Sequence, residues 1–237
     1  MSLGICSLVY GNDHLLEFNK LVQTINDIPI YVYTDLDILK LNSRLNTTHS
    51  TIPFNYNLKR FAIQSGLEVH NTILCLDTDI TLNYNLNLLP PLSDGIYTNW
   101  CGNIQMYNDI KLSINKFINK ESGIGELTNY ASSLIECGAN KKNIIFFDEF
   151  AFIVKISDTD IKTKFIKEWN DIANTTLCSQ PTDRHGENLN GALESLIISL
   201  AAHKCGLSIF SNKLETELLF KSTIHHNSNT NILKQLI

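Results

Sequence analysis

Three short apolar runs, separated by segments with helical periodicity, constrain the fold of this chain more than any other feature of its sequence. The runs cover residues 3–10, 29–35 and 72–76 and are almost continuously apolar, as strands buried on both faces of a parallel sheet are. Between them, residues 13–26 and 55–67 carry apolar side chains at the spacing of an amphipathic helix. This alternation predicts an α/β fold, in which a mostly parallel sheet is flanked by helices.

The remaining elements are expected at less regular intervals. Asp13 is expected to cap the first helix and Asp158 a later one. A short strand is expected near residue 52, with further strands at 95–100, 144–155 and 207–210, and with helices at 107–119, 125–137, 158–174 and 192–205, the last of these stopped by Gly206. Because no repeat, low-complexity tract or linker divides the chain, we expect one domain over residues 1–237.

Charge and hydropathy argue against several classes of protein. The net charge of -5 argues against a nucleic-acid-binding protein, which would usually be basic. No apolar run approaches the ~20 residues of a membrane-spanning helix, and the first residues lack the basic segment of a signal peptide, so we expect no integral membrane segment and no leader. The six cysteines form no CxxC pair, which favours reduced thiols in a cytoplasmic protein over disulfides or a zinc site.

Polar residues follow the predicted strands at the ends that a parallel sheet brings together. Tyr10, Asp35, Asp77 and Asp79 all fall at the carboxyl end of an expected strand. In open α/β sheets, ligands bind beyond the carboxyl ends of the strands. These four residues therefore predict a ligand site at that edge of the sheet.

The segment TILCLDTDITL (72–82) places two carboxylates, Asp77 and Asp79, at the end of a buried strand with one residue between them. Side chains alternate along a strand, so the two acids share a face if the extended backbone continues. Two neighbouring carboxylates favour a divalent cation such as Mg2+ or Mn2+, which prefers oxygen ligands and is often completed by substrate phosphates. An ordinary acid pair in a strand-end turn is the alternative.

The segment NLKRFAIQSGLEVHNTILCLDTDITL (57–82) resembles the nucleotide-sugar site of GT-A-fold glycosyltransferases, in which a basic helix precedes a strand that ends in a DxD motif. YVYTD (31–35) resembles the second strand of that fold, whose terminal acid commonly reads the nucleotide base. The resemblance implies a metal-dependent glycosyltransferase that uses Mn2+ or Mg2+. It also implies a nucleoside-diphosphate-sugar donor, with a UDP-sugar expected first, and a carbohydrate or other hydroxyl acceptor. Residues 1–100 would then bind the donor and residues 101–237 the acceptor.

The resemblance also implies roles for individual residues of the donor half. Asp79 would bind the metal directly, while Asp77 would contact ribose, sugar or the metal through water, with Thr78 between them. The remaining contacts would come from Asp35 to the base edge, from Tyr10 or Asn12 to base or ribose, and from Lys59 or Arg60 to diphosphate or sugar. A solvated helix face is the alternative for each of the two basic residues.

Two segments of the second half resemble further parts of that family. Glu194 opens a predicted helix and lies twelve residues before Gly206, the spacing that GT-A enzymes often show after the first member of an acidic pair. Ser195 occupies the second acidic place, so the resemblance leaves Glu194 to deprotonate the acceptor hydroxyl or, in a retaining enzyme, to orient the sugar. STIHHNSN (222–229) offers His225, or His226 beside it, as a late metal ligand.

Asp148 and Glu149 interrupt the apolar run expected to form the strand at 144–155. Either acid is a candidate to accept a hydrogen bond from a sugar hydroxyl, or to act as the base in place of Glu194.

Two other functions share the same residues. LDTDIT (76–81) also matches the DxDxT phrase of haloacid-dehalogenase-type phosphatases, in which the first acid is a nucleophile and the second a general acid, with Mg2+ required. That phrase usually lies near the start of the chain and is followed by a glycine, which Ile80 replaces here. A non-catalytic nucleotide-sugar-binding protein is the third possibility, favoured by Ser195 at the second acidic place.

Overall fold

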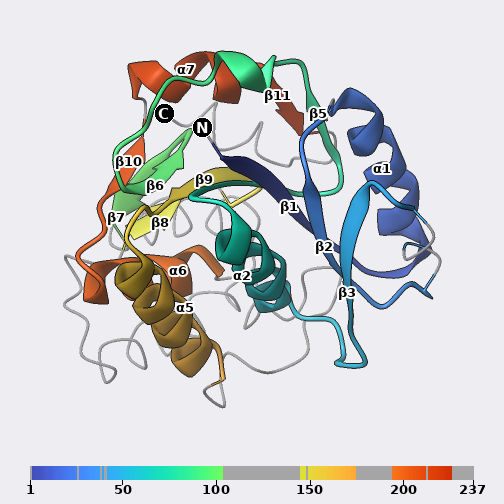
Figure 1. The fold of residues 1–237 in the computed structure, drawn as a ribbon, viewed down its shortest axis with the longest axis horizontal. Coiled ribbons are helices and arrows are strands. Elements are labelled where there is room, and N and C mark those ends of the chain that lie inside the picture. The colour runs from blue at the N-terminus through green and yellow to red at the C-terminus, as the bar shows by residue number, and fades with distance from the viewer. Residues whose placement is uncertain are drawn as a thin grey trace, which may run out of the picture.

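The computed structural model describes residues 2–25, 27–37, 39, 42–103, 145–147, 149–174, 194–211 and 213–225. These residues form a central seven-stranded sheet with helices on both faces (Figure 1). The strand order is β10-β6-β9-β4-β1-β2-β3. The strands are β1 (Leu3–Val9), β2 (Ile30–Thr34), β3 (Leu45–His49), β4 (Thr72–Leu76), β6 (Gly95–Thr98), β9 (Ala151–Lys155) and β10 (Ile209–Ser211).

The sheet is mostly parallel. Only β9 runs antiparallel to its two neighbours, β4 and β6, while every other pair in this sheet is parallel. The fold class expected from the sequence, a mostly parallel sheet flanked by helices, is therefore confirmed. Strands β9 and β10 come from after residue 100, and β6, from before it, lies between them. The two halves of the chain therefore share one sheet.

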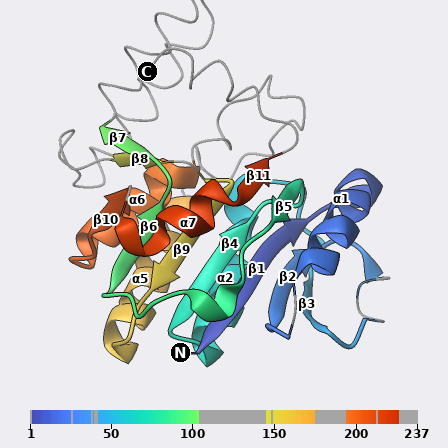
Figure 2. The ribbon, with the colours of Figure 1, turned by 90° about the horizontal axis from the view of Figure 1, so that it is seen from above.

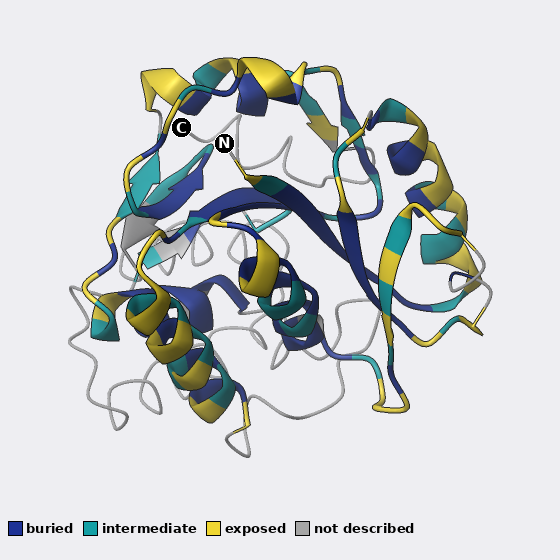
Figure 3. Cartoon of the chain, in the orientation of Figure 1, coloured by how far each residue is buried: buried dark blue, intermediate teal, exposed yellow. Residues whose placement is uncertain are grey.

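Five α-helices of the described residues cover the two faces of the sheet (Figure 2). Helices α2 (Lys59–Val69), α5 (Thr159–Ala173) and α6 (Glu194–Lys204) cover one face, and α1 (Gly11–Thr24) and α7 (Leu214–Lys221) cover the other. Two small antiparallel sheets pair β5 (Ile80–Leu82) with β11 (Thr223–His225) and β7 (Cys101–Asn103) with β8 (Ile145–Phe147). Figure 3 shows the buried strands between helices whose outer faces are exposed.

Local signals at helix ends behave as predicted in the second half. The Asp158 side chain accepts hydrogen bonds from the backbone N–H groups of Asp160 and Ile161, at 2.8 and 2.9 Å, and so caps α5. Gly206 follows the end of α6 with a φ of +72°, a left-handed conformation that glycine adopts without steric cost.

Other boundaries differ from the predictions. No strand forms near residue 52; the strand is β3 instead, where every second residue is exposed and the sequence LNTTH lacks an apolar run. Helix α1 begins at Gly11 rather than after Asp13. Its N-cap is Tyr10, whose backbone is extended and whose side chain makes no capping hydrogen bond. The run 144–155 is not one strand but two, β8 and β9, which belong to different sheets.

Some expectations concern residues outside the described ranges: the helices at 107–119 and 125–137, Asp148 and His226. The four cysteines in the described ranges, Cys6, Cys75, Cys101 and Cys205, are unpaired thiols. Within the same ranges, no helix has the length and apolar character needed to cross a membrane.

Candidate functional site

The carboxyl ends of the parallel strands and the amino end of β9 meet at one edge of the sheet. Asp77 follows β4 directly, and Glu149 and Phe150 come immediately before β9. The backbone N–H of Asp77 donates to the carbonyl oxygen of Phe150 at 2.9 Å, which extends the β4–β9 pairing beyond both strands. Residues far apart in the sequence thus lie together at the edge where the sequence predicts a ligand site.

Lys59, the first residue of α2, connects three elements at this edge. Its ammonium group donates to Asp77 Oδ1 at 2.7 Å and lies 3.2 Å from Glu194 Oε1, at the start of α6. It also donates to the backbone oxygen of Glu149 at 3.3 Å. The side chains of Lys59 and Glu194 are only 2% and 1% exposed, whereas that of Asp77 is 30% exposed. We call Lys59, Asp77, Glu149 and Glu194 the Lys59 cluster.

The Lys59 cluster holds three carboxyl groups and one ammonium group. Burial by itself lowers the pKa of Lys59, but the carboxylates of Asp77 and Glu194 together hold that pKa well above its usual value. Burial raises the pKa of Glu194 well above its usual value, although Lys59 opposes the change. Because the single positive charge is already paired with Asp77, ionising a further buried carboxyl group is costly.

Glu149 faces the first turn of α6. Its Oε2 accepts a hydrogen bond from the backbone N–H of Ser195 at 2.9 Å. Burial raises the pKa of Glu149 from 4.5 to about 7, against the opposing effect of Lys59. Of the expected acid pair, Glu149 thus lies with the other charged groups, and Asp148 falls outside the described residues.

The strand that follows the DxD motif lies beside the histidine segment. β5 begins directly after Asp79 and pairs antiparallel with β11, with Ile80 opposite His225. Asp79 is half-buried. Thr78, between the two acids, is buried, and its hydroxyl donates to Glu17 Oε2 of α1 at 3.4 Å. Within the described ranges, no three His, Cys, Asp or Glu side chains converge as a complete metal-binding group.

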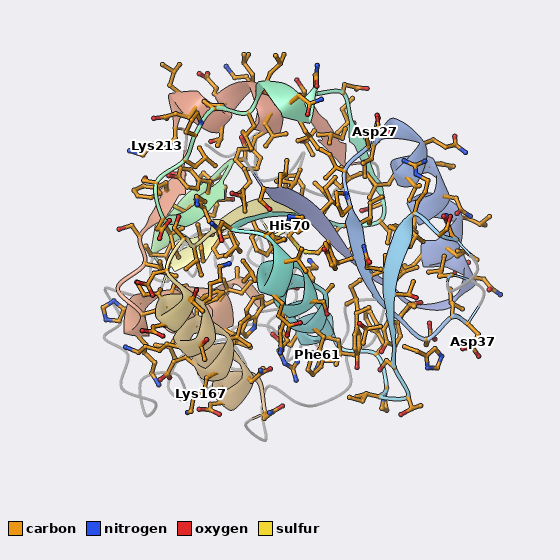
Figure 4. All side chains as sticks on the ribbon, viewed as in Figure 1. Asp27, Asp37, Phe61, His70, Lys167 and Lys213 are labelled. Carbon is orange, nitrogen blue, oxygen red and sulfur yellow. The ribbon has the colours of Figure 1, made fainter. Side chains whose placement is uncertain are left out.

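Arg60, next to Lys59, lies in a different environment. Its guanidinium donates to the backbone oxygen of Asn57 at 2.8 Å and to the side-chain oxygens of Asn170 and Asn174 at 2.9 and 3.1 Å. It also stacks over the ring of Phe61, labelled in Figure 4, at 4.2 Å from the ring centroid. We call Arg60 with Asn57, Asn170 and Asn174 the Arg60 network; it links α2 to α5. Of the two basic candidates, only Lys59 contacts Asp77.

The ends of β1 and β2 carry a row of aromatic side chains. Tyr10 and Tyr33 stack with ring centroids 6.4 Å apart, and Tyr33 stacks on Phe61 at 4.8 Å. Tyr10 is buried, its hydroxyl donates to the backbone oxygen of Ile52 at 3.3 Å, and burial raises its pKa to about 12. Tyr10 is a residue that the sequence predicts at the site, whereas Tyr33 and Phe61 are not; the alternating tyrosines of IYVYT are the sequence signal for Tyr33.

Asp35 and Asn12 flank this aromatic row. The Asp35 carboxylate, directly after β2, accepts a hydrogen bond from the backbone N–H of Gly11 at 2.9 Å, where β1 passes into α1. Gly11 has a φ of +67°, which a residue with a side chain rarely adopts. Asn12 is exposed in the first turn of α1. Both polar residues are thus present at the carboxyl edge, and Asp35 stabilises the turn there.

Comparisons with known proteins give matches by structure only. No family model matches the sequence, and no curated protein sequence does. Among solved structures, the bifunctional glycosyltransferase WbbM matches with 10% identity and a TM-score of 0.46, over 96% of this chain but only 46% of that one. The galactosyltransferase LgtC, solved with donor and acceptor sugar analogues, matches with 10% identity and a TM-score of 0.47, over 96% of this chain and 88% of that one.

A third match is the Drosophila β1,4-galactosyltransferase 7 mutant solved with manganese, UDP-Gal and xylobiose. It has 13% identity and a TM-score of 0.44, over 98% of this chain and 74% of that one. Likeness at this level does not extend to activity, metal or substrate.

Proposed function

We propose that this chain is a glycosyltransferase of the GT-A class that transfers a sugar from a nucleoside diphosphate to an acceptor hydroxyl. The observation that carries the proposal is the Lys59 cluster. It joins the first acid of the DxD motif to a basic helix and to an acid from the second half of the chain, at the edge where α/β sheets bind ligands. A buried cluster with more carboxyl groups than cations is also a feature of functional rather than purely structural sites.

The donor would lie along the carboxyl edge. We place its base beside Tyr10 and Asp35 and its diphosphate near Asp79. We place its sugar near Asp77 and Glu194, since Lys59 contacts both of these acids and Asp77 is partly exposed. A UDP-sugar remains the first donor to test.

A divalent metal fits the donor atoms at this edge. Carboxylate oxygens and histidine imidazoles are ligands that Mn2+ accepts. The two aspartates follow β4, and β11, which ends with His225, pairs with β5 directly after Asp79. Mg2+ and Mn2+ usually take few protein ligands and are completed by substrate phosphates, so a full protein cage is not required. Asp79 would be the direct protein ligand, with His225 or His226 as a further one. When bound, the ion would neutralise the charge of the diphosphate leaving group.

Glu194 is proposed to act on the reacting sugars. Once ionised, a carboxyl group whose pKa is raised is a stronger base than an ordinary glutamate, and the Lys59 ammonium, 3.2 Å away, favours the ionised form of Glu194. In an inverting reaction Glu194 would take the proton of the acceptor hydroxyl, and in a retaining reaction it would orient the donor sugar beside Lys59.

The test is a panel of nucleotide sugars with the purified chain. Thermal-shift measurements with UDP-, GDP-, CMP- and dTDP-sugars, with and without Mn2+, should show a raised melting temperature for one nucleotide class in the presence of metal. Nucleotide release should then be measured with and without simple sugar acceptors. Hydrolysis of a generic phosphate ester without nucleotide-sugar turnover would instead support the phosphatase. Metal-dependent binding without any turnover would support the non-catalytic alternative.

A further inference from the structure

Helix α6 delivers Glu194 to the Lys59 cluster from its first residue, so the position of that helix end determines where the carboxyl group lies. The first N–H groups of a helix have no partner within the helix and need one from elsewhere. For Ser195 that partner is the Glu149 carboxylate, at 2.9 Å. A negatively charged or hydrogen-bonding group at this end is also favoured by the helix dipole.

The backbone around Glu149 holds the other half of the cluster. The carbonyl oxygen of Glu149 accepts from the Lys59 ammonium at 3.3 Å, and the next carbonyl, of Phe150, accepts from the N–H of Asp77 at 2.9 Å. Two consecutive residues between β8 and β9 therefore contact Lys59, Asp77 and the start of α6.

We propose that Glu149 is a positioning residue, whose carboxyl oxygen fixes the first turn of α6 and thereby holds Glu194 against Lys59. This assigns Glu149 a role different from the hydroxyl acceptor or base that the sequence suggests. The consequence for catalysis rests on the proposed function, because it requires Glu194 to act on the sugars. The consequence for the position of α6 is independent of the proposed function.

Two substitutions separate position from charge. Glu149→Gln removes the charge but keeps the length of the side chain and an oxygen that can accept from Ser195. Glu149→Asp keeps the charge but shortens the side chain by one methylene, so its oxygens no longer reach the helix from the same backbone position. A control, Glu168→Gln, removes a carboxylate that pairs with Lys204 at the other end of α6, at 2.9 Å.

The first readout is amide hydrogen exchange at Ser195 and the following residues of α6 in the full chain, which needs no substrate. We expect exchange to rise by roughly tenfold or more in Glu149→Asp and to stay within about threefold of the unmodified protein in Glu149→Gln and Glu168→Gln. Unchanged exchange in Glu149→Asp, or equal loss of protection in Glu149→Asp and Glu149→Gln, would overturn the proposal.

The second readout is kinetic and uses the donor that the panel identifies. Glu149→Asp should lower kcat by roughly tenfold or more with little change in donor KM, whereas Glu149→Gln should keep most of the kcat of the unmodified protein. If Glu149 were itself the base, Glu149→Gln would be the less active of the two. If no nucleotide sugar is turned over, the proposed function fails while the exchange result still decides whether Glu149 positions α6.

Discussion

Lys59 and Arg60 are neighbours in the first turn of α2, yet they serve two regions that differ in charge balance. The Arg60 network pairs one cation with neutral amide oxygens and joins two helices. The Lys59 cluster sets one cation among three carboxyl groups at the edge of the sheet. Burial alone therefore does not identify a functional site, because both cations are buried. The two regions differ in their charge balance, and the excess of carboxyl groups around Lys59 is the reason why we propose that region as the functional site.

The largest expected effect follows from removing the cation of the Lys59 cluster. Lys59→Met should destabilise the protein by about 3–5 kcal/mol, because it leaves buried carboxyl groups without a counter-charge. Urea unfolding followed by circular dichroism measures this change, with Lys59→Arg as the charge-preserving control. A loss as small as that of an exposed lysine, such as Lys20, would contradict the proposed dependence of the cluster on Lys59.

The next effect concerns activity rather than stability. Asp79→Asn should lower donor turnover by a factor of roughly several hundred while the melting temperature stays close to that of the unmodified protein. Asp171→Asn is the matched control, because Asp171 is a surface residue of α5 that pairs with Lys167 of the same helix. Near-normal turnover in Asp79→Asn would remove the metal from the proposed function.

Disrupting the Arg60 network should lower stability but leave the binding of the donor unchanged. Arg60→Met should cost about 1–3 kcal/mol of unfolding free energy, since three oxygens lose a donor, and should leave donor affinity unchanged. Chemical denaturation and nucleotide-sugar titration measure the two quantities. A large loss of donor affinity in a variant that remains folded would place Arg60 at the ligand after all.

The smallest expected effect is on the pH dependence of stability. The pKa of Glu149 is raised by burial from 4.5 to about 7, so between these values the folded state holds a proton that the unfolded state has released. Stability should therefore be highest below about pH 4.5 as far as this group is concerned, and should fall as pH rises to about 7.

The full shift would correspond to about 3 kcal/mol, but Glu149 is partly exposed and solvent screening reduces the effect. Glu149→Gln should therefore flatten the decline by roughly 1–2 kcal/mol. The measurement is a series of urea-unfolding curves from pH 4.5 to 8 for both proteins. A decline of equal size in both would show that Glu149 does not titrate in this range, and Arg60→Met should leave the decline unchanged.

Features governed by local chemistry were predictable from the sequence. The apolar runs located β1, β2 and β4, and the side chain of Asp158 and the backbone freedom of Gly206 marked helix ends. The edge strand β3 was missed because its exposed face is polar. The run at 144–155 was misread because apolar character alone does not show where a chain leaves one sheet for another.

The site was predictable only in part. The acidic pair and the basic helix lie close in the sequence, so their meeting at the edge of the sheet could be expected. Which of Lys59 and Arg60 faces Asp77 depends on the rotation of α2, and the contact of Glu149 with Ser195 depends on how β9 and α6 meet. Neither follows from spacing along one chain. The assignments of donor, metal and acceptor remain predictions.

The pairing of β5 with β11 has a consequence for how the protein is made. Asp79 emerges from the ribosome early, but the strand that begins right after it finds its partner only when Thr223–His225 has been synthesised. The strand after the acidic motif therefore stays without this partner until residues 223–225 have been made. A nascent chain that contains every carboxylate of the Lys59 cluster would still lack β11, so under the proposed function the chain is expected to hold a donor only after residue 225 has emerged from the ribosome.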